Sequence, residues 1–194
     1  MTYPSAKDLK PLVQRARATM ANTGRPPVTP EPIGPGEESV WDFPRPPAVQ
    51  TVADRVRVLF GGQAIADTTN AIRVAETAGA PVYFIPEADI AMDALSPSNA
   101  SYSICEWKGA AVYFDLSAGG KTSEAAAFGY PDPLTDLVPD FARLPGRIAF
   151  YAGRVDEAWI GDTMATPQAG GLYAGWVTPK LKGPIKGAPG TGHW

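Results

Sequence analysis

Glycine and proline recur so often along this chain that long helices have little room. Its 194 residues include 20 Gly and 21 Pro, and the apolar residues fall in short runs between them. Both residue types favour turns, and proline disrupts the interior of a helix. Hydrophobic residues still make up 44% of the chain, which is enough for a real core. The sequence therefore predicts a mainly β fold built from short strands and many loops.

Composition divides the chain into three segments. Residues 1–37 form an N-terminal arm, with a helix expected over 5–22 from its apolar spacing and a Pro-rich connector after it. Residues 38–160 carry the strand patterns and form the β-rich core domain. Residues 161–194 are rich in Gly, Pro, Thr and Lys. We expect them to be an extended C-terminal tail that wraps the surface or is disordered.

Two hairpins stand out in the core domain. Apolar and polar residues alternate on both sides of Gly61-Gly62, and both glycines can take a positive φ. Residues 56–60 and 63–66 are therefore predicted to pair as antiparallel strands. A second hairpin is expected across Lys108-Gly109.

Other short apolar runs are also typical of strands. They occupy residues 71–76, 81–86 and 147–151. Residues 155–160 are expected to pair with the last of these runs, because only three residues separate the two.

The chain has one cysteine, Cys105, and one histidine, His193. A single cysteine cannot form an internal disulfide or a Cys-rich zinc site. His193 stands beside the C-terminus in a Gly/Pro-rich tail, so the sequence offers no His base for a Ser-His-Asp or Cys-His hydrolase. No Walker-type phosphate loop occurs either. We predict that the protein uses no cofactor and binds no metal tightly.

Charge is unevenly distributed along the chain, with basic ends flanking an acidic body. The ends could grip a polyanion, but folding back onto the acidic body is the preferred interpretation. An acidic body without a basic stripe argues against sequence-specific binding of nucleic acid. No apolar run is long enough for a membrane span, and the first residues lack the apolar run of a signal peptide. A cytoplasmic protein without a membrane partner is expected.

Several short motifs follow one another in an order that is typical of a known family. They are Phe60-Gly61-Gly62 with Ala66-Asp67, Arg73 with Glu76, residues 81–86, and Cys105-Glu106-Trp107-Lys108-Gly109. On these motifs, residues 38–160 resemble the bacterial domain-of-unknown-function family four-two-seven. The resemblance implies a β-tent-like fold, in which two small antiparallel sheets meet at an angle. The N-terminal helix and the long C-terminal tail lie outside it.

Family catalogues label this family nucleotidyltransferase-like, which can be compared with the residues present. Nucleotidyl transfer generally needs two or three carboxylates on neighbouring strands to hold Mg²⁺. The sequence contains no Asp-x-Asp, and the nearest approximation, Glu87-Ala88-Asp89, stands at an expected turn. The residues themselves therefore lend the transferase label little support.

The predicted ligand-binding residues all lie inside the family-like motifs. They are Arg73, Glu76, Tyr83, Cys105, Trp107 and Lys108. We expect Arg73 and Lys108 to border one shared cleft, because two cations that converge in an acidic body would create a local anion site. A structural ion pair is the alternative role for Arg73. Cys105 is either a thiol activated by a nearby ammonium group or a small packed residue.

The leading functional hypothesis is a β domain that binds a small anionic ligand in this cleft. One alternative is an enzyme, either nucleotidyltransferase-like or dependent on Cys105. A protein-interaction module that uses a strand edge or the basic ends is another. No catalytic residue is assigned at this stage.

Overall fold

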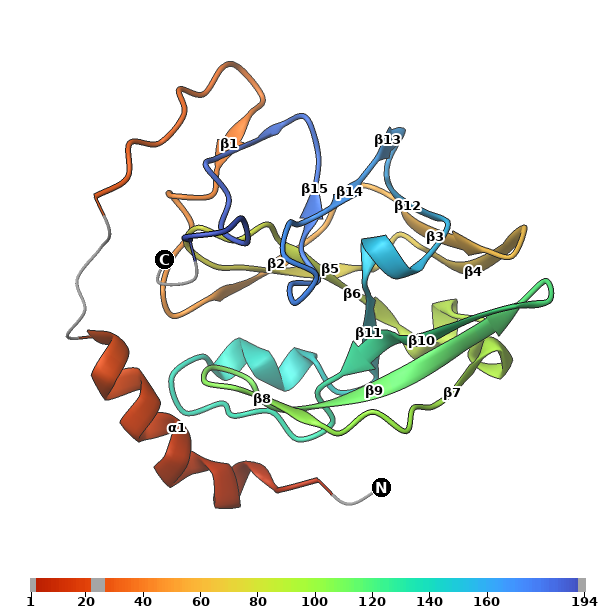
Figure 1. Ribbon diagram of the computed structural model, residues 1–194, viewed down its shortest axis with the longest axis horizontal. Helices are drawn as coiled ribbons and strands as arrows, with labels where there is room; N and C mark the ends of the chain where they lie inside the picture. The colour runs from red at the N-terminus through yellow and green to blue at the C-terminus, as the bar shows by residue number, and fades with distance from the viewer. Residues whose placement is uncertain (1–2, 22–26, 192–194) are drawn as a thin grey trace.

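The structure is a computed structural model that describes residues 3–21 and 27–191, with the side chains of residues 19–21 left out. The described residues form one α-helix and many short strands (Figure 1). Most of these strands pair antiparallel. The mainly β fold and the N-terminal helix are thus confirmed. No described helix is long and apolar enough to cross a membrane.

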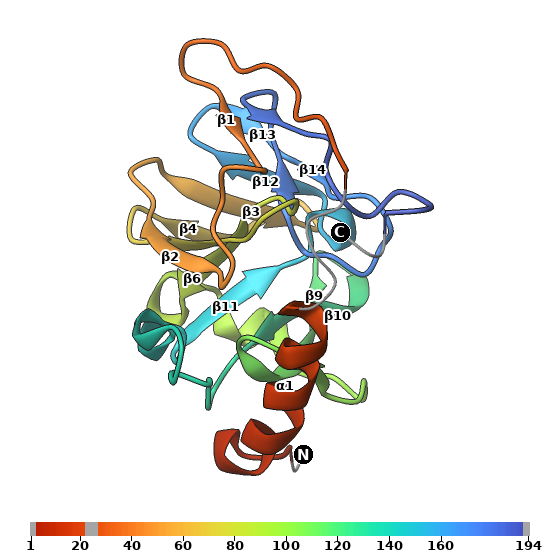
Figure 2. The same cartoon turned by 90° about the vertical axis from the view of Figure 1, so that its left-hand side faces the viewer.

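The helix α1 spans Ala6–Ala21 and begins where the sequence predicts. Ser5 caps it, because its Oγ accepts a hydrogen bond from the Asp8 backbone N–H and its own N–H donates to the Asp8 carboxylate. Leu9 and Val13 are buried one turn apart, on the face that packs against the body. The expected end at residue 22 lies outside the described residues. Figures 1 and 2 show α1 beside the body, where it contacts the strand β9 (Gly109–Ala118).

An eight-stranded antiparallel sheet, hereafter the large sheet, forms the centre of the molecule. Its strands in spatial order are β2 (Ala48–Thr51), β5 (Ile72–Ala75), β6 (Val82–Pro86), β11 (Arg147–Phe150), β10 (Lys121–Gly129), β9 (Gly109–Ala118) and β7 (Leu95–Pro97), with β8 (Ser103–Cys105) also paired to β9. The pairing of β8 with β9 confirms the hairpin expected across Lys108-Gly109.

Four strands form the small sheet, in the order β13 (Thr163–Met164), β12 (Glu157–Ile160), β3 (Val56–Phe60) and β4 (Gln63–Thr68). The hairpin predicted across Gly61-Gly62 is confirmed, and both glycines have positive φ angles, 59° and 74°. An added Cβ on Gly61 would lie 2.1 Å from the carbonyl oxygen of Ala118, so only glycine fits there.

The expected pairing of residues 155–160 with 147–151 is wrong. β12 pairs instead with β3, with Ala158 opposite Val58. The 3-10 helix η4 (Ala152–Arg154) turns the chain out of the large sheet before β12 begins. There the apolar side chains of β12 and β3 bury each other in the small sheet, which decides the pairing. The other 3-10 helices are η1 (Glu87–Asp89), η2 (Met92–Ala94) and η3 (Pro139–Arg143).

The described part of the C-terminal segment, residues 161–191, packs closely on the body. It adds β16 (Leu181–Lys182), which pairs in parallel with β1 (Glu38–Ser39), and the hairpin of β14 (Thr166–Pro167) with β15 (Trp176–Val177). Trp176 is only 1% exposed and donates its indole N–H to the carbonyl oxygen of Phe150 over 2.9 Å. This segment therefore wraps the surface and inserts an anchor into the core.

The large sheet buries both of its faces. One face packs against the small sheet in a cluster that includes Val58 and Ile85. The opposite face carries a second cluster, which includes Phe84 and Phe128. Since successive strand residues point to opposite faces, neighbours such as Phe84 and Ile85 belong to different clusters. This alternation decides which expected site residues can meet.

Candidate functional site

A pocket of about 310 Å³, hereafter the main pocket, lies on the face of the large sheet that points away from the small sheet. Val74 of β5, Phe84 of β6 and Phe128 of β10 line it. Residues of the C-terminal segment, from Gln168 to Lys186, form part of its wall. Its volume stands at the lower end of the range usual for small-molecule sites.

Cys105 and Lys108 both reach the main pocket from one tight turn. β8 ends at Cys105, and β9 begins at Gly109, its partner across the hairpin. Gly109 has a φ of 96°, a conformation that glycine adopts without strain. Cys105 is a free cysteine that is only partly buried. The turn therefore presents a thiol and an ammonium group to the same cavity.

Lys108 retains its charge in this setting. Burial alone lowers the pKa of a lysine, but the interactions of Lys108 with Cys105 and Glu76 outweigh it, so that the pKa of Lys108 is raised. Its Nζ lies 5.7 Å from the ring centre of Tyr130 and 5.9 Å from that of Phe141. Aromatic faces at this distance attract a cation. Lys108 is thus an ammonium ion at neutral pH.

Three tyrosines, Tyr113, Tyr130 and Tyr151, also line the main pocket. Burial, followed by the effects of Cys105 and Tyr113, raises the pKa of Tyr130 well above its usual value. Burial and the nearby Tyr113 likewise raise the pKa of Tyr151. Tyr113 shares a hydrogen bond of 2.6 Å with the hydroxyl of Ser103. Tyr130 and Tyr151 therefore stay protonated at neutral pH and can donate hydrogen bonds to a ligand.

Glu76 lines the main pocket directly after β5. Its Oε1 accepts a hydrogen bond from the indole N–H of Trp107 over 3.2 Å and pairs with Nε of Arg45, also at 3.2 Å. Trp107 is buried and stands behind the wall of the pocket, outside the residues that line it. Glu76, Cys105 and Lys108 are thus brought together as expected, and Trp107 supports Glu76 from behind.

Arg73 and Tyr83 lie elsewhere, so the expected cleft shared by Arg73 and Lys108 does not exist. Both line a second cleft of about 560 Å³, on the other face of β5 and β6. The reason is strand alternation: Val74, next to Arg73, points into the main pocket, and so does Phe84, next to Tyr83. A spacing of 35 residues between Arg73 and Lys108 could not reveal that Arg73 lies on the face of β5 that points away from the main pocket.

In the second cleft Arg73 makes a structural ion pair, the alternative role that its sequence context allowed. Its Nη1 and Nη2 lie 2.5 and 2.8 Å from the two carboxylate oxygens of Glu38, and its Nε donates to Gln50 over 2.8 Å. Glu38 raises the pKa of Arg73, and burial raises that of Tyr83. The guanidinium is therefore already satisfied by the protein itself.

Several residues of the pocket wall were missed by sequence reasoning. Gln168 is buried, receives a hydrogen bond from the Ala80 backbone N–H over 3.0 Å, and donates one to the Lys186 carbonyl oxygen over 2.9 Å. The Nζ of Lys186 lies 5.1 Å from the ring centre of Tyr173. Gln168, Tyr173 and Lys186 fall in the segment expected to be a tail, and Ala80 does not. The Gly/Pro-rich composition of that segment contains no local signal for a pocket wall.

The acidic motif Glu87-Ala88-Asp89 forms η1, away from the residues that line the main pocket. Asp89 accepts a hydrogen bond from the Thr68 hydroxyl over 2.6 Å. Within residues 3–21 and 27–191, no three His, Cys, Asp or Glu side chains are grouped so that they could hold a metal ion.

Comparison with known families places this site in context. Residues 48–161, more than half of the chain, match the family described as a domain of unknown function (DUF427), under the label NTP_transf_9. The chain belongs to the DUF427 family. The resemblance seen in the sequence motifs is thus confirmed. No match to the chain was found among curated proteins. The DUF427 region supplies Glu76, Cys105 and Lys108, whereas α1 and the wall residues after 161 lie outside it.

Proposed function

We propose that the main pocket binds a small molecule that carries an anionic group. The observation that carries the proposal is the position of Lys108, a charged ammonium group beside a pocket that is also lined by protonated tyrosine hydroxyls. An ammonium group partly removed from water attracts carboxylate or phosphate oxygens more strongly than an exposed one. Glu76 and Cys105 add polar contacts that orient the rest of the molecule.

The same pocket favours a ligand with an apolar or aromatic part. Phe84 and Phe128 are buried side chains that line it, and flat aromatic surfaces stack well with rings and alkyl groups. Near the mouth, Ile104 and Leu172 are exposed by 42% and 75%. Apolar side chains that line a pocket and face solvent supply a surface for a ligand to cover.

We also propose that the protein works in a reducing compartment, the cytoplasm of a bacterium. Cys105 is a free thiol in an accessible pocket. Such thiols persist where thiol reductants are abundant.

A thermal-shift experiment tests the ligand proposal. The panel comprises orthophosphate, pyrophosphate, AMP, citrate and benzoate, and the proteins are the wild type, Lys108→Met and the control Lys10→Met. Lys10 is exposed on α1 and is not among the residues that line the pocket. An anion at about one hundred times its Kd stabilises the native state by about 2.7 kcal/mol. We expect at least one anion to raise the Tm of the wild type and of Lys10→Met, and the rise to vanish in Lys108→Met. No rise with any anion, or an equal rise in Lys108→Met, contradicts the proposal.

A second candidate function is favoured by Cys105 itself, which is partly exposed in the pocket and interacts with Lys108. A cysteine thiolate is the form that attacks acyl groups. The sulfur bonds to the acyl carbon of an ester while the C–O bond breaks and the alcohol oxygen leaves with the electron pair. Water then adds to the thioester carbon, the C–S bond breaks, and the acid and the thiol are released.

Turnover of p-nitrophenyl acetate tests this second candidate. The rate of p-nitrophenolate release by the wild type is compared with that of free cysteine and of Cys105→Ser. An acyl-transfer enzyme gives multiple turnovers faster than free cysteine, and Cys105→Ser abolishes them. Release at the rate of free cysteine, or continued turnover in Cys105→Ser, rules this function out.

A further inference from the structure

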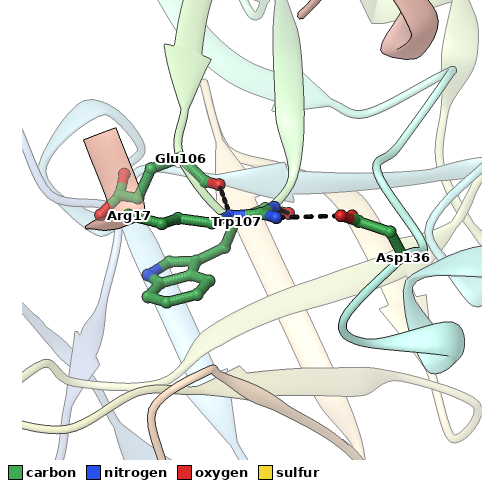
Figure 3. Close-up of polar contacts among 4 residues, drawn as sticks. All are labelled: Arg17, Glu106, Trp107 and Asp136. Carbon is green, nitrogen blue, oxygen red and sulfur yellow. Dashed lines mark hydrogen bonds and ion pairs between the residues drawn. The ribbon is translucent and has the colours of Figure 1, made fainter. Parts of the chain in front are cut away.

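The helix α1 meets the turn that carries Cys105 and Lys108, although it lies outside the DUF427 region. The contact is made by Arg17, whose side chain is only 9% exposed. Its Nε donates to the carbonyl oxygen of Glu106 over 2.6 Å and its Nη2 to that of Trp107 over 3.3 Å. Figure 3 shows the guanidinium between this turn and Asp136, which pairs with Nη1 at 3.2 Å.

All three carbonyl groups between the thiol and the end of the turn accept hydrogen bonds from other segments. Arg17 donates to those of Glu106 and Trp107, and the backbone N–H of Leu134 donates to that of Lys108 over 3.0 Å. Buried carbonyl groups that lose their donors incur a free-energy cost, so the chain would rearrange to recover partners. The conformation of the turn therefore depends on Arg17.

A second line of contacts links Arg17 to the pocket. The guanidinium carbon lies 5.4 Å from the ring centre of Trp107, and the indole N–H of Trp107 in turn holds Glu76. Without the cation over its ring, Trp107 loses one of the interactions that fix its orientation. Arg17 therefore supports both polar sides of the main pocket. It acts on Glu76 through Trp107, and it binds the turn with Cys105 and Lys108 directly.

We propose that Arg17 is a positioning residue of the main pocket, and that α1 acts through it as a clamp that holds Cys105 and Lys108 together. The proposal rests on the proposed function for the role of the pocket, but its test needs no ligand. Because the chain contains one cysteine, alkylation by iodoacetamide reports on Cys105 alone.

The rate of this alkylation at one pH reports how often the turn opens and exposes the thiol, because Cys105 is only partly exposed in the folded protein. The hydrogen bonds from Arg17 hold the turn closed, so their loss raises the population of the open turn. A role of Arg17 in global stability alone would lower the Tm and leave this rate unchanged at temperatures well below the Tm.

The experiment compares the full-length wild type with Arg17→Ala, Arg17→Lys and two controls. Arg17→Lys keeps the charge but cannot bridge two carbonyl groups and Asp136 at once. Val13→Ala weakens the packing of α1 and leaves Arg17 in place, and Lys10→Ala changes an exposed position of the same helix. Rates are measured by intact mass at one neutral pH, well below the Tm of each variant.

We expect Arg17→Ala to speed alkylation by roughly tenfold, because a lost charged hydrogen bond raises the population of the open turn on this scale. Arg17→Lys should show part of this effect and the two controls almost none. An alkylation rate unchanged in both Arg17 variants overturns the proposal. If Arg17→Ala fails to fold, Arg17→Lys decides alone. Absence of anion binding by the wild type would end the proposed function but would leave this result standing.

Discussion

The indole N–H of Trp107 donates a hydrogen bond to Glu76 over 3.2 Å and so ties the turn between β8 and β9 to the end of β5. The same carboxylate oxygen of Glu76 forms an ion pair with Nε of Arg45. Two residues that are 31 positions apart in sequence thereby hold the polar groups of the main pocket in fixed places. A site held by buried hydrogen bonds is preorganised for its ligand.

Substituting the first glycine of the β3–β4 hairpin should be far more costly than substituting the second. Gly61→Ala places a Cβ 2.1 Å from the Ala118 carbonyl oxygen at a φ of 59°, whereas nothing lies within 4 Å of the Cβ in Gly62→Ala. Gly62→Ala should cost about 1–2 kcal/mol for the left-handed conformation, and Gly61→Ala at least about 3 kcal/mol. Urea unfolding measures both, and equal losses contradict the close packing of this turn.

Removing the anchor of the C-terminal segment should destabilise the whole protein. Trp176→Ala empties a fully buried site and leaves the Phe150 carbonyl oxygen without its donor. The expected loss in the free energy of unfolding is about 3–5 kcal/mol. Leu172→Ala, at a position 75% exposed in the same segment, should change it by less than about 0.5 kcal/mol. If Trp176→Ala unfolds like the wild type, the segment does not belong to the core.

Tyr130 should make stability fall at alkaline pH. Its pKa is raised in the folded protein, mainly by burial, above the value of 10.0 that applies when it is exposed. Above that pH the unfolded chain loses the proton while the native state keeps it, so stability declines as pH rises. Tyr130→Phe removes this contribution and should flatten the decline. The test is urea unfolding from neutral pH to about pH 11, and superimposable profiles contradict the assignment.

Arg73 should stabilise the fold and take no part in ligand binding. It pairs with Glu38 through both carboxylate oxygens, in a cleft on the other face of the sheet from Lys108. Since the Glu38 side chain is 38% exposed, the coupling free energy from a double-mutant cycle of Arg73→Met and Glu38→Gln should be modest, about 1 kcal/mol. Any anion effect on the Tm should persist in Arg73→Met. Its loss there would point to the second cleft.

Local sequence patterns predicted the elements of this fold well and their long-range partners less well. The Gly61-Gly62 hairpin follows from residues next to one another, and so does the turn at Lys108-Gly109. The partner of β12 does not, because η4 redirects the chain and the burial of Ala158 against β3 outweighs proximity in sequence. Pairing between distant strands is decided by the apolar surface buried at both ends.

The same contrast between local motifs and long-range contacts applies to the residues of the site. Glu76, Cys105 and Lys108 are identified from motifs and do converge, whereas the placement of Arg73 is wrong because its motif carries no information about which face of β5 points to the main pocket. The contribution of Arg17 comes from α1, outside the DUF427 match, and rests on contacts across 89 and 90 residues. Only tertiary structure brings such positions together.

The most direct test of the central claim, that Lys108 binds an anion in the main pocket, is protection of Cys105 from iodoacetamide. Alkylation of the single thiol is followed by intact mass while orthophosphate, pyrophosphate, AMP, citrate or benzoate is titrated into wild type, Lys108→Met and Lys10→Met. The account predicts that at least one anion slows alkylation to a saturating limit in the wild type and Lys10→Met, and has no effect in Lys108→Met. Alkylation that no anion slows, or that is slowed equally in Lys108→Met, would contradict it.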